Sequence, residues 1–170
     1  MIFRLSQKLA TKLHVSTLSA LPADANPYAD WSAHLFTADR TQHIIISNTK
    51  SLYSAATYGK GITDSAVFID RALSTIRDFM EADKQAFAYH RFIAPASVNV
   101  RFAKMLDRAI IGSINELVKS AKFRLEEDEV SPFDVAAELN EVPMTALGRY
   151  TAETFGIPNE VFRAMMRRQK

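Results

Sequence analysis

The spacing of hydrophobic and polar residues predicts a β-meander over residues 31–58. Apolar runs rich in β-branched side chains are separated by polar interruptions of turn length at 39–41 and 48–50. Stiff side chains, such as the isoleucines at 44–46, favour extended backbone over helix. Strands joined by such short turns pair antiparallel, because parallel pairing needs a long crossover. The predicted strands are residues 31–38, 42–47 and 51–58.

Two longer segments repeat their apolar residues with the period of an α-helix. The first, residues 64–82, has Asp64 or Ser65 as its N-cap, and the second, residues 107–126, begins at Asp107. Their apolar stripes must be buried, so we expect both helices to cover one face of the sheet. The stripes comprise Ile69, Leu73, Ile76 and Met80 in the first helix, and Ile110, Ile114, Leu117, Val118, Ala121 and Leu125 in the second.

Shorter segments are assigned from their breakers and local composition. Prolines and small polar residues mark loops, and Pro95 separates two apolar stretches that we interpret as extended. The predicted extended segments are residues 2–5, 85–93 and 97–102, the predicted short helix is 6–13, and the predicted loop is 21–30.

A helical region is predicted at the C-terminal end. Ser131 is placed to cap a helix, Pro132 suits its first turn, and Asp134 completes a capping pattern. The predicted fold class is α+β: an antiparallel sheet including the 31–58 meander, covered by two long helices, with a helical C-terminal region. We expect a core domain over 1–128 and a helical extension over 129–170, packed together as one structural unit.

Composition narrows the class of protein. The 170 residues are 48% hydrophobic and 24% charged, which is typical of a single globular domain. The absence of cysteine excludes disulfides, thiol nucleophiles and cysteine-ligated zinc. Polar residues at Gln7, Lys8 and Lys12 interrupt any secretory signal, and no apolar run reaches the roughly 20 residues of a membrane span. We therefore expect a cytoplasmic protein that does not bind membranes.

Five strings of the sequence carry a resemblance to a known family: WSAHLFTADRTQ at 31–42, NTKSLYS at 48–54, YGKGI at 58–62, RFIAP at 91–95 and SPFD at 131–134. They resemble a bacterial family of unknown function, domain-of-unknown-function number 6933. The resemblance extends over nearly the whole chain, and Asp-Arg-Thr-Gln and Ser-Leu-Tyr-Ser are its most specific parts. It implies a bacterial protein in one folded unit, and it implies no activity and no catalytic residue.

The first candidate for ligand binding is the segment Gly59, Lys60 and Gly61 before the first long helix. Backbone amides at such a turn can hold a phosphate, and Lys60 would add a positive charge. The segment lacks the earlier glycine and the Ser or Thr of a P-loop. The alternative interpretation is that the two glycines only permit a tight turn from strand to helix.

The first predicted turn is the strongest candidate for partner binding. Asp39, Arg40 and Gln42 would lie at the tip of a hairpin, where a rigid sheet presents them to a carboxylate, a phosphate or a protein. Lys60 and His34 are also predicted to bind a ligand or partner. The alternative is ordinary turn chemistry with Arg40 in solvent.

A catalytic alternative uses histidine and tyrosine. His90, Arg91, Tyr53 and Tyr58 would have to meet Arg40 and Lys60 on one face, as in a small ribonuclease that needs no metal. No pair of histidines has a helical i, i+4 spacing, and a first turn that pairs Ala38 with Thr41 or Gln42 would place His34 opposite Ile45 or Ile46 rather than His43. The sequence therefore predicts no metal site and no cofactor.

The net charge of +2 does not by itself indicate nucleic-acid binding, but the end of the chain is basic. Arg163, Arg167 and Arg168 surround an apolar helical face, which predicts either a packed terminal helix or a nucleic-acid contact. The leading hypothesis is a non-enzymatic module that binds a protein partner through the meander turns and the C-terminal helices. The alternatives are a ribonuclease or phosphate-binding enzyme and a nucleic-acid-binding protein, and the oligomeric state is not predicted.

Overall fold

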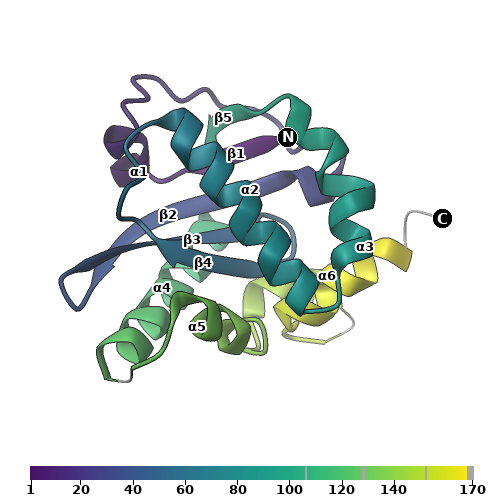
Figure 1. The fold of residues 1–170 in the computed structure, drawn as a ribbon. Coiled ribbons are helices and arrows are strands. Elements are labelled where there is room, and N and C mark those ends of the chain that lie inside the picture. The colour runs from purple at the N-terminus through teal and green to yellow at the C-terminus, as the bar shows by residue number, and fades with distance from the viewer. Residues whose placement is uncertain (106, 128, 152, 168–170) are drawn as a thin grey trace.

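One five-stranded sheet organises the protein (Figure 1). The computed structural model describes residues 1–105, 107–127, 129–151 and 153–167. The strand order is β4-β3-β2-β1-β5, and the predicted meander is confirmed as the antiparallel run β2-β3-β4. The strands are β1 Ile2–Leu5, β2 Asp30–Ala38, β3 Thr41–Asn48, β4 Ser54–Tyr58 and β5 Arg101–Lys104.

The sheet is mixed, and in this respect it differs from the expected antiparallel sheet. Strand β1 lies between β2 and β5 and runs parallel to both, with Phe3 opposite Trp31 on one side and Phe102 on the other. Parallel pairing is possible because long connections join these strands. The connection from β1 to β2 contains helix α1 (Gln7–Lys12) and the 3₁₀ turn η1 (Pro27–Ala29).

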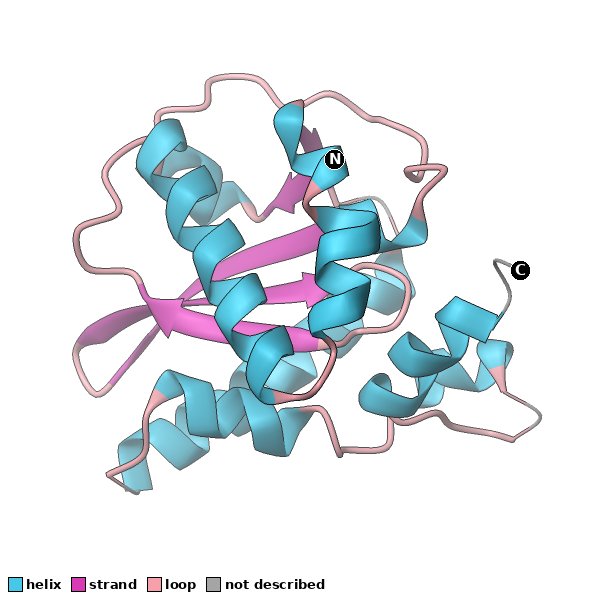
Figure 2. Cartoon of the chain, turned by 45° about the vertical axis from the view of Figure 1, so that its right-hand side comes forward, coloured by secondary structure: helices cyan, strands magenta, loops and turns pink. Residues whose placement is uncertain are grey.

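The two long helices lie on opposite faces of the sheet, whereas we expected both on one face (Figures 1 and 2). Helix α2 (Ser65–Ala82) buries Phe68 and Ile76 in one core cluster, and α4 (Arg108–Glu127) buries its stripe in the other. Alternate strand residues point to opposite faces, so the isoleucines at 44–46 supply both clusters. Ile44 and Ile46 belong to the cluster under α2, and Ile45 belongs to the cluster under α4.

Residues 86–98 are helical, and the prediction of extended structure for 85–93 is wrong. They form the short helix α3 (Ala86–Ala88), the π-helical turn η2 (Tyr89–Ile93) and the 3₁₀ turn η3 (Pro95–Val98). The apolar residues of this stretch are too few to distinguish a strand from one buried helical turn by periodicity. Only the end of the second segment becomes a strand, β5.

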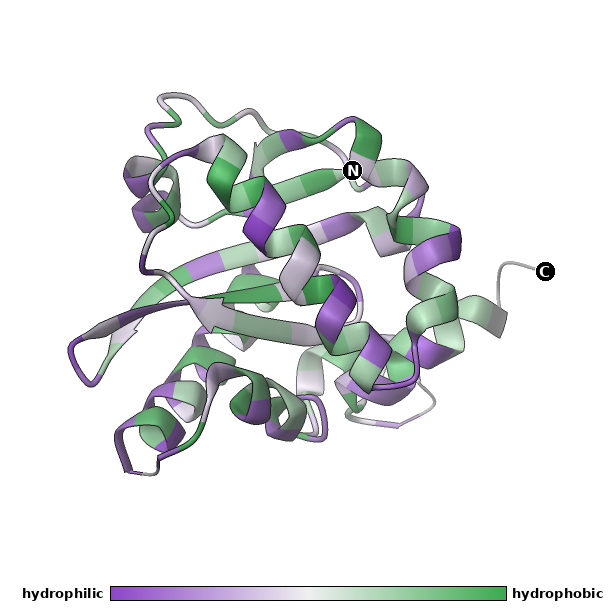
Figure 3. Cartoon of the chain, in the orientation of Figure 1, coloured by the Kyte–Doolittle hydropathy of each residue, from purple (hydrophilic) through white to green (hydrophobic). Residues whose placement is uncertain are grey.

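The C-terminal region is helical, as predicted, and contributes to both core clusters. Helix α5 (Pro132–Leu139) begins with the predicted capping box of Ser131 and Asp134. The 3₁₀ helix η4 (Thr145–Tyr150) and helix α6 (Pro158–Arg167) follow. Figure 3 shows hydrophobic residues interspersed with hydrophilic ones along these helices. The division into 1–128 and 129–170 stays a prediction, and residues 128 and 168–170 lie outside the described residues.

Within the described residues, no helix combines the length and apolar character that crossing a membrane requires.

Candidate functional site

A cavity of about 560 Å³ lies beside β1 and β2, on the sheet face that also carries α4. The connection between β1 and β2 passes this part of the sheet as a loop, and residues 21–27 of that loop form one wall of the cavity. The other walls come from the turn between β3 and β4, the start of α4 and η4. Its polar or charged lining residues are Arg4, Asp24, Asp30, Ser32, Thr49, Lys50, Asp107, Arg149 and Tyr150, and its apolar lining residues include Leu21, Pro22, Pro27, Met105 and Ile110.

A buried ion pair forms the floor of the cavity. Arg4 on β1 donates from Nε and Nη2 to the two carboxylate oxygens of Asp30 on β2, each at 2.8 Å. Its remaining donors go to backbone carbonyl oxygens of the surrounding loops, at Leu21, Pro22 and Lys104 (2.9–3.1 Å). A guanidinium has five N–H donors, so Arg4 is saturated. Arg4 therefore shapes the cavity and ties together its walls, with no donor left for a ligand.

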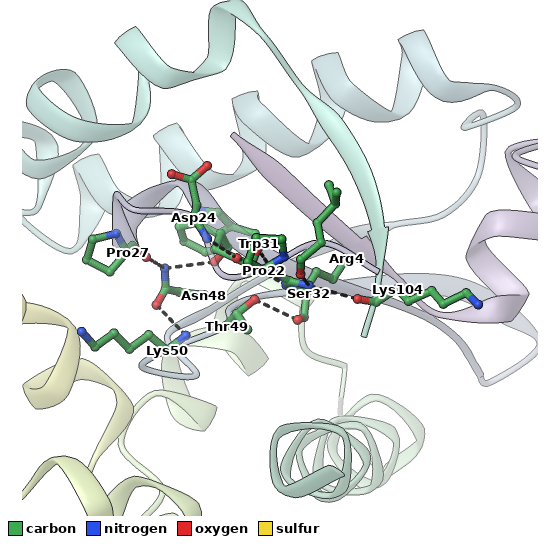
Figure 4. A network of polar contacts seen from close by, with 12 residues as sticks. Arg4, Pro22, Asp24, Pro27, Trp31, Ser32, Asn48, Thr49, Lys50 and Lys104 are labelled. Carbon is green, nitrogen blue, oxygen red and sulfur yellow. Dashed lines mark hydrogen bonds and ion pairs between the residues drawn. The ribbon is translucent and has the colours of Figure 1, made fainter. Parts of the chain in front are cut away.

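Asn48 shapes the turn that carries two of the lining residues (Figure 4). Its side chain is fully buried, and Nδ2 donates to the carbonyl oxygen of Pro27 at 2.8 Å. Its Oδ1 accepts hydrogen bonds from the backbone N–H groups of Lys50 (3.2 Å) and Ser51 (3.0 Å). Side-chain acceptance from following amides is the usual way in which Asn stabilises a turn. The positions of Thr49 and Lys50 beside the cavity follow from these contacts.

Two hydroxyl groups face one another across the end of the meander. Ser32 Oγ on β2 lies 2.9 Å from Thr49 Oγ1, and either can be the donor (Figure 4). Each hydroxyl carries one proton, and the mutual hydrogen bond uses one of the two. The pair therefore keeps one O–H donor for another group at the cavity.

Two of the positive groups of the cavity, Lys50 and Arg149, lie beside Tyr150 in η4. The guanidinium carbon of Arg149 lies 5.0 Å from the centre of the Tyr150 ring, and Lys50 Nζ lies 5.9 Å from it. Cations at these distances from an aromatic face are attracted to its negative quadrupole. The second turn of the meander, which carries Lys50, and the 3₁₀ helix η4, which carries Arg149, thus meet at the Tyr150 ring.

Asp107 anchors Arg149 at the start of α4. Its Oδ1 accepts from the backbone N–H groups of Ala109 (2.8 Å) and Ile110 (3.3 Å), which confirms the predicted N-cap. Its Oδ2 accepts from Nη1 and Nη2 of Arg149 at 3.2 and 3.1 Å. Partial burial disfavours the charged form, but the amides and Arg149 outweigh it, so the pKa of Asp107 lies below its ordinary value. Asp107 is therefore a poor candidate for a general base.

The arrangement has the composition of a binding site more than that of a reaction centre. Apolar walls surround a few convergent polar groups, which is typical of cavities that hold small molecules. The described residues that line the cavity include no histidine. No group of three or more His, Asp or Glu side chains suited to a metal ion occurs among residues 1–105, 107–127, 129–151 and 153–167.

The residues predicted for partner binding lie away from this cavity, at the opposite end of the β2–β3 hairpin. Asp39 and Arg40 form the two-residue tip, with positive φ angles of 41° and 59° as in a type I′ turn. His34 pairs with Ile45, as the short turn predicts. Burial, together with the charges of Lys8 and Lys122, lowers the pKa of His34.

The glycine-rich segment has the geometry of a tight turn. Gly61 has a φ of 80°, and a Cβ at Gly59 would meet the Cβ of Gln42 at 3.0 Å. The first amides of α2, at Ala66 and Val67, donate to the carboxylate of Asp64 at 2.9 and 3.0 Å. A phosphate at this helix start would need the same two amides, which already donate to Asp64. Lys60 is exposed on this turn, and Gln42 Oε1 accepts from Lys12 Nζ at 2.7 Å.

The residues of the catalytic alternative do not share one face. The Tyr53 hydroxyl donates to Asp83, directly after the end of α2, and exposed His90 lies 3.9 Å from Glu81 near the same end. Lys60 precedes the start of α2, a helix of 18 residues that spans about 27 Å. Arg91 is exposed beside His90, and half-exposed Tyr58 packs against the His43 ring on the edge of the sheet.

The basic tail is only partly described. Arg163 donates to Asp83 Oδ1 at 3.0 Å, so Asp83 links helix α6 to Tyr53. Burial, followed by the charge of Asp83, raises the pKa of Tyr53 well above its ordinary value. The side chain of Arg167 and the whole of Arg168 lie outside the described residues. The binding and catalytic roles predicted for these residues stay predictions.

The sequence analysis missed the residues that line the cavity. They come from positions as far apart as Arg4 and Tyr150, and no local spacing relates them. One signal did point toward them: the string NTKSLYS, on which the family resemblance rests, contains Asn48, Thr49 and Lys50. The rest needed the parallel strand β1 and the docking of η4, which are tertiary features.

Fold and site together define a small α+β protein with a mixed sheet and a cavity on one sheet face. The chain belongs to the family described as domain of unknown function DUF6933, whose model matches residues 2–160. The match includes every residue that lines the cavity. No solved structure matches the chain.

Proposed function

We propose that this protein is a non-enzymatic binding module, and that its ligand occupies the cavity between the second meander turn and η4. The observation that carries this proposal is the cavity itself: its volume of about 560 Å³ is in the range of small-molecule sites. Its walls come from segments far apart in the chain. A ligand there would contact the meander and the C-terminal region together, which are the two regions through which the sequence analysis expected a protein partner to bind.

The bonding state of the lining residues supports binding over catalysis. Arg4 and Asp30 satisfy one another and the nearby carbonyl groups. Asp107 holds a helix start and Arg149, and its lowered pKa opposes proton transfer near neutral pH. These groups give the cavity a fixed shape, and a preformed site loses little free energy in ordering when its ligand binds.

The proposal is tested by retention of small molecules. The purified protein is incubated with a metabolite extract, washed by ultrafiltration and denatured, and the released compounds are identified by mass spectrometry. We expect one compound class to be retained and released unchanged. The variant Ala25→Trp, which places a large ring at the cavity wall, should retain at least about tenfold less because it fills the site.

Ala164→Trp on the exposed side of α6 is the matched control and should behave as the natural chain does. Equal retention by Ala25→Trp and the natural chain would place the ligand elsewhere and contradict the proposal. Release of a chemically altered compound would instead show that the protein is an enzyme.

A further inference from the structure

We infer that the cavity binds a small organic anion, in which an apolar body carries one carboxylate or phosphate group. In this arrangement Lys50 and Arg149 hold the anionic group beside Tyr150, and the apolar body lies against the walls of the cavity. The inference rests on the proposed function and adds the chemical class of the ligand.

The charges of the cavity leave Lys50 without a compensating carboxylate. Among the described residues, no Asp or Glu oxygen forms an ion pair with Lys50 Nζ, whose neighbour is the Tyr150 ring at 5.9 Å. The charges of Arg4 and Asp30 cancel one another in their buried pair. Asp24 also lines the cavity, but Figure 4 shows its carboxylate pointing away from the turn that carries Lys50. An anionic group near Tyr150 would supply the missing negative charge.

Arg149 has donors to spare for the same anion. Nη1 and Nη2 each give one N–H to a single oxygen of Asp107, which accounts for two of the five guanidinium donors among the contacts of the described residues. The bridge to Asp107 fixes the plane of the guanidinium. A group fixed in this way can bind a carboxylate or phosphate through charge-assisted hydrogen bonds without losing further side-chain freedom.

The hydroxyl pair adds a neutral donor on the sheet side. The Ser32–Thr49 hydrogen bond uses only one of the two hydroxyl protons, so the other proton can be donated to the ligand. Figure 4 shows the Lys50 side chain extending away from this pair, so the hydroxyl and the ammonium group would contact different parts of the ligand. The ligand would thus meet donors from β2, from the turn and from η4.

The remaining walls specify an apolar body. Leu21, Pro22 and Pro27 come from the loop over the sheet, Met105 directly follows β5, and Ile110 comes from the start of α4. These side chains offer no hydrogen bonds, and burying apolar surface against them contributes roughly 25 cal/mol per Å². An inorganic ion would leave this surface in contact with water. The full site therefore suits an organic anion better than free phosphate.

Isothermal titration calorimetry with matched probes tests the inference. 2-Naphthoate and 2-naphthyl phosphate carry the apolar body and an anion, 2-naphthamide keeps the body without the charge, and inorganic phosphate keeps only the anion. We expect one or both organic anions to bind at least about tenfold more tightly than 2-naphthamide, which is the effect of one charge-assisted contact. Whichever organic anion binds more tightly identifies carboxylate or phosphate as the group.

Lys50→Gln should reduce that preference for the anion, with Arg149 retaining part of it, while leaving the binding of 2-naphthamide unchanged. Lys119→Gln, at an exposed position on α4, alters the net charge equally and should leave the preference intact. A preference lost to the same extent in both variants would overturn the inference, because general attraction would then explain it. Inorganic phosphate that binds as tightly as the organic anions would overturn it as well.

The two proposals fail in different ways. Equal affinities for 2-naphthoate, 2-naphthyl phosphate and 2-naphthamide, all lost in Ala25→Trp, would refute the organic anion and leave the binding module standing. Binding of no probe, or binding that Ala25→Trp does not weaken, would refute the organic anion; the metabolite-retention experiment then decides the binding module separately.

Discussion

Asn48 illustrates how a single side chain determines the shape of the cavity. The amide donates to the carbonyl oxygens of Pro27 and Asp30 and accepts from the turn that follows. All of these groups are buried or partly buried, so each would lose hydrogen bonding if the amide were removed. At the level of the sequence, Asn48 is only a typical turn residue. Its contacts with Pro27 and Asp30 appear only when the chain is folded.

Asn48→Asp is expected to destabilise the protein by on the order of 2–4 kcal/mol. The substitution keeps the size of the side chain but presents a carboxylate oxygen to two carbonyl oxygens, in a buried environment. Urea denaturation at neutral pH measures the free energy of unfolding. Asn99→Asp makes the same change at an exposed position and is expected to alter it by less than about 0.5 kcal/mol. Equal effects of the two substitutions would refute this account of Asn48.

The burial of His43 leads to a second prediction at the residue scale, on how stability depends on pH. Its ring is 3% exposed between the rings of Phe36 and Tyr58, and its Nδ1 has no hydrogen-bond partner among the described residues. Burial lowers its pKa, and a backbone hydrogen bond with Ala38 offsets only part of this effect. Protonation therefore favours the unfolded chain. The stability contributed by neutral His43 is complete above pH 6.5, the ordinary pKa, and is lost as the pH falls below it.

His43→Phe should reduce the loss of stability between about pH 7 and about pH 5.5, because it removes one of the groups that take up a proton on unfolding. The change in slope is at most about 1.4 kcal/mol per pH unit, the contribution of one proton. Urea denaturation at the two pH values measures it. His34 has a lowered pKa too, so part of the slope should persist. Identical slopes for His43→Phe and the natural chain would contradict the prediction.

At the scale of elements, the edge of the sheet is completed by a helix rather than by another strand. Asn140, which follows α5, accepts from the backbone N–H of Ser54 at 2.7 Å and donates to its carbonyl oxygen at 2.8 Å. The Asn140 side-chain amide thus makes the two hydrogen bonds that a neighbouring strand would otherwise make with Ser54 on edge strand β4. Such coverage also protects an edge strand from pairing with another chain. No local sequence pattern relates Asn140 to Ser54, which lies 86 residues earlier in the chain.

Asn140→Leu is expected to cost on the order of 2–4 kcal/mol of stability, since it leaves the N–H and C=O of Ser54 buried without a partner. Amide hydrogen exchange at Ser54 should become faster at the same time. Asn115→Leu, at an exposed position of α4, is the control for a change of hydrophobicity alone. Unchanged exchange at Ser54 in Asn140→Leu would show that this contact does not hold α5 against the sheet.

At the scale of the whole molecule, the C-terminal helices complete the core of the sheet. Phe162 on α6 is fully buried, and its ring centre lies 4.2 Å from that of Tyr53 and 5.0 Å from that of Tyr28. Trp31, the single tryptophan of the chain, packs against it as well. Removing a buried aromatic side chain leaves a cavity that the surrounding residues fill only in part. Because Phe162 joins helix α6 to the core of the sheet, we expect residues 129–170 to unfold together with the sheet as one cooperative unit.

Phe162→Ala is expected to lower the free energy of unfolding by about 3–5 kcal/mol. In the natural chain, unfolding followed by Trp31 fluorescence and by far-UV circular dichroism should give one coincident transition, as for a single two-state unit. Phe123→Ala, at a position 63% exposed on α4, should have little effect. Two separate transitions in the natural chain would show that 129–170 folds apart from the sheet.

Local physical rules explain which features were predictable. The β-branched run at 44–46, the polar turn at 39–41 and the capping box at Ser131 each act within a few residues, so their sequence patterns predicted the meander and the start of α5. The same rules gave a wrong prediction for residues 86–98, because short apolar segments fit either a strand or a helical turn. The cavity could not be predicted at all, since its lining combines β1, the meander turn, α4 and η4.

The sequence by itself determined the meander, the two amphipathic helices and the helical C-terminal region, because hydrophobic period and capping are local properties of the chain. Only the tertiary structure decided the parallel place of β1, the division of the long helices between two faces and the meeting of Lys50 with Arg149 at Tyr150. These arrangements come from the burial of surfaces between distant segments. Burial is non-directional, so an apolar stripe shows that a segment needs a partner without showing which one.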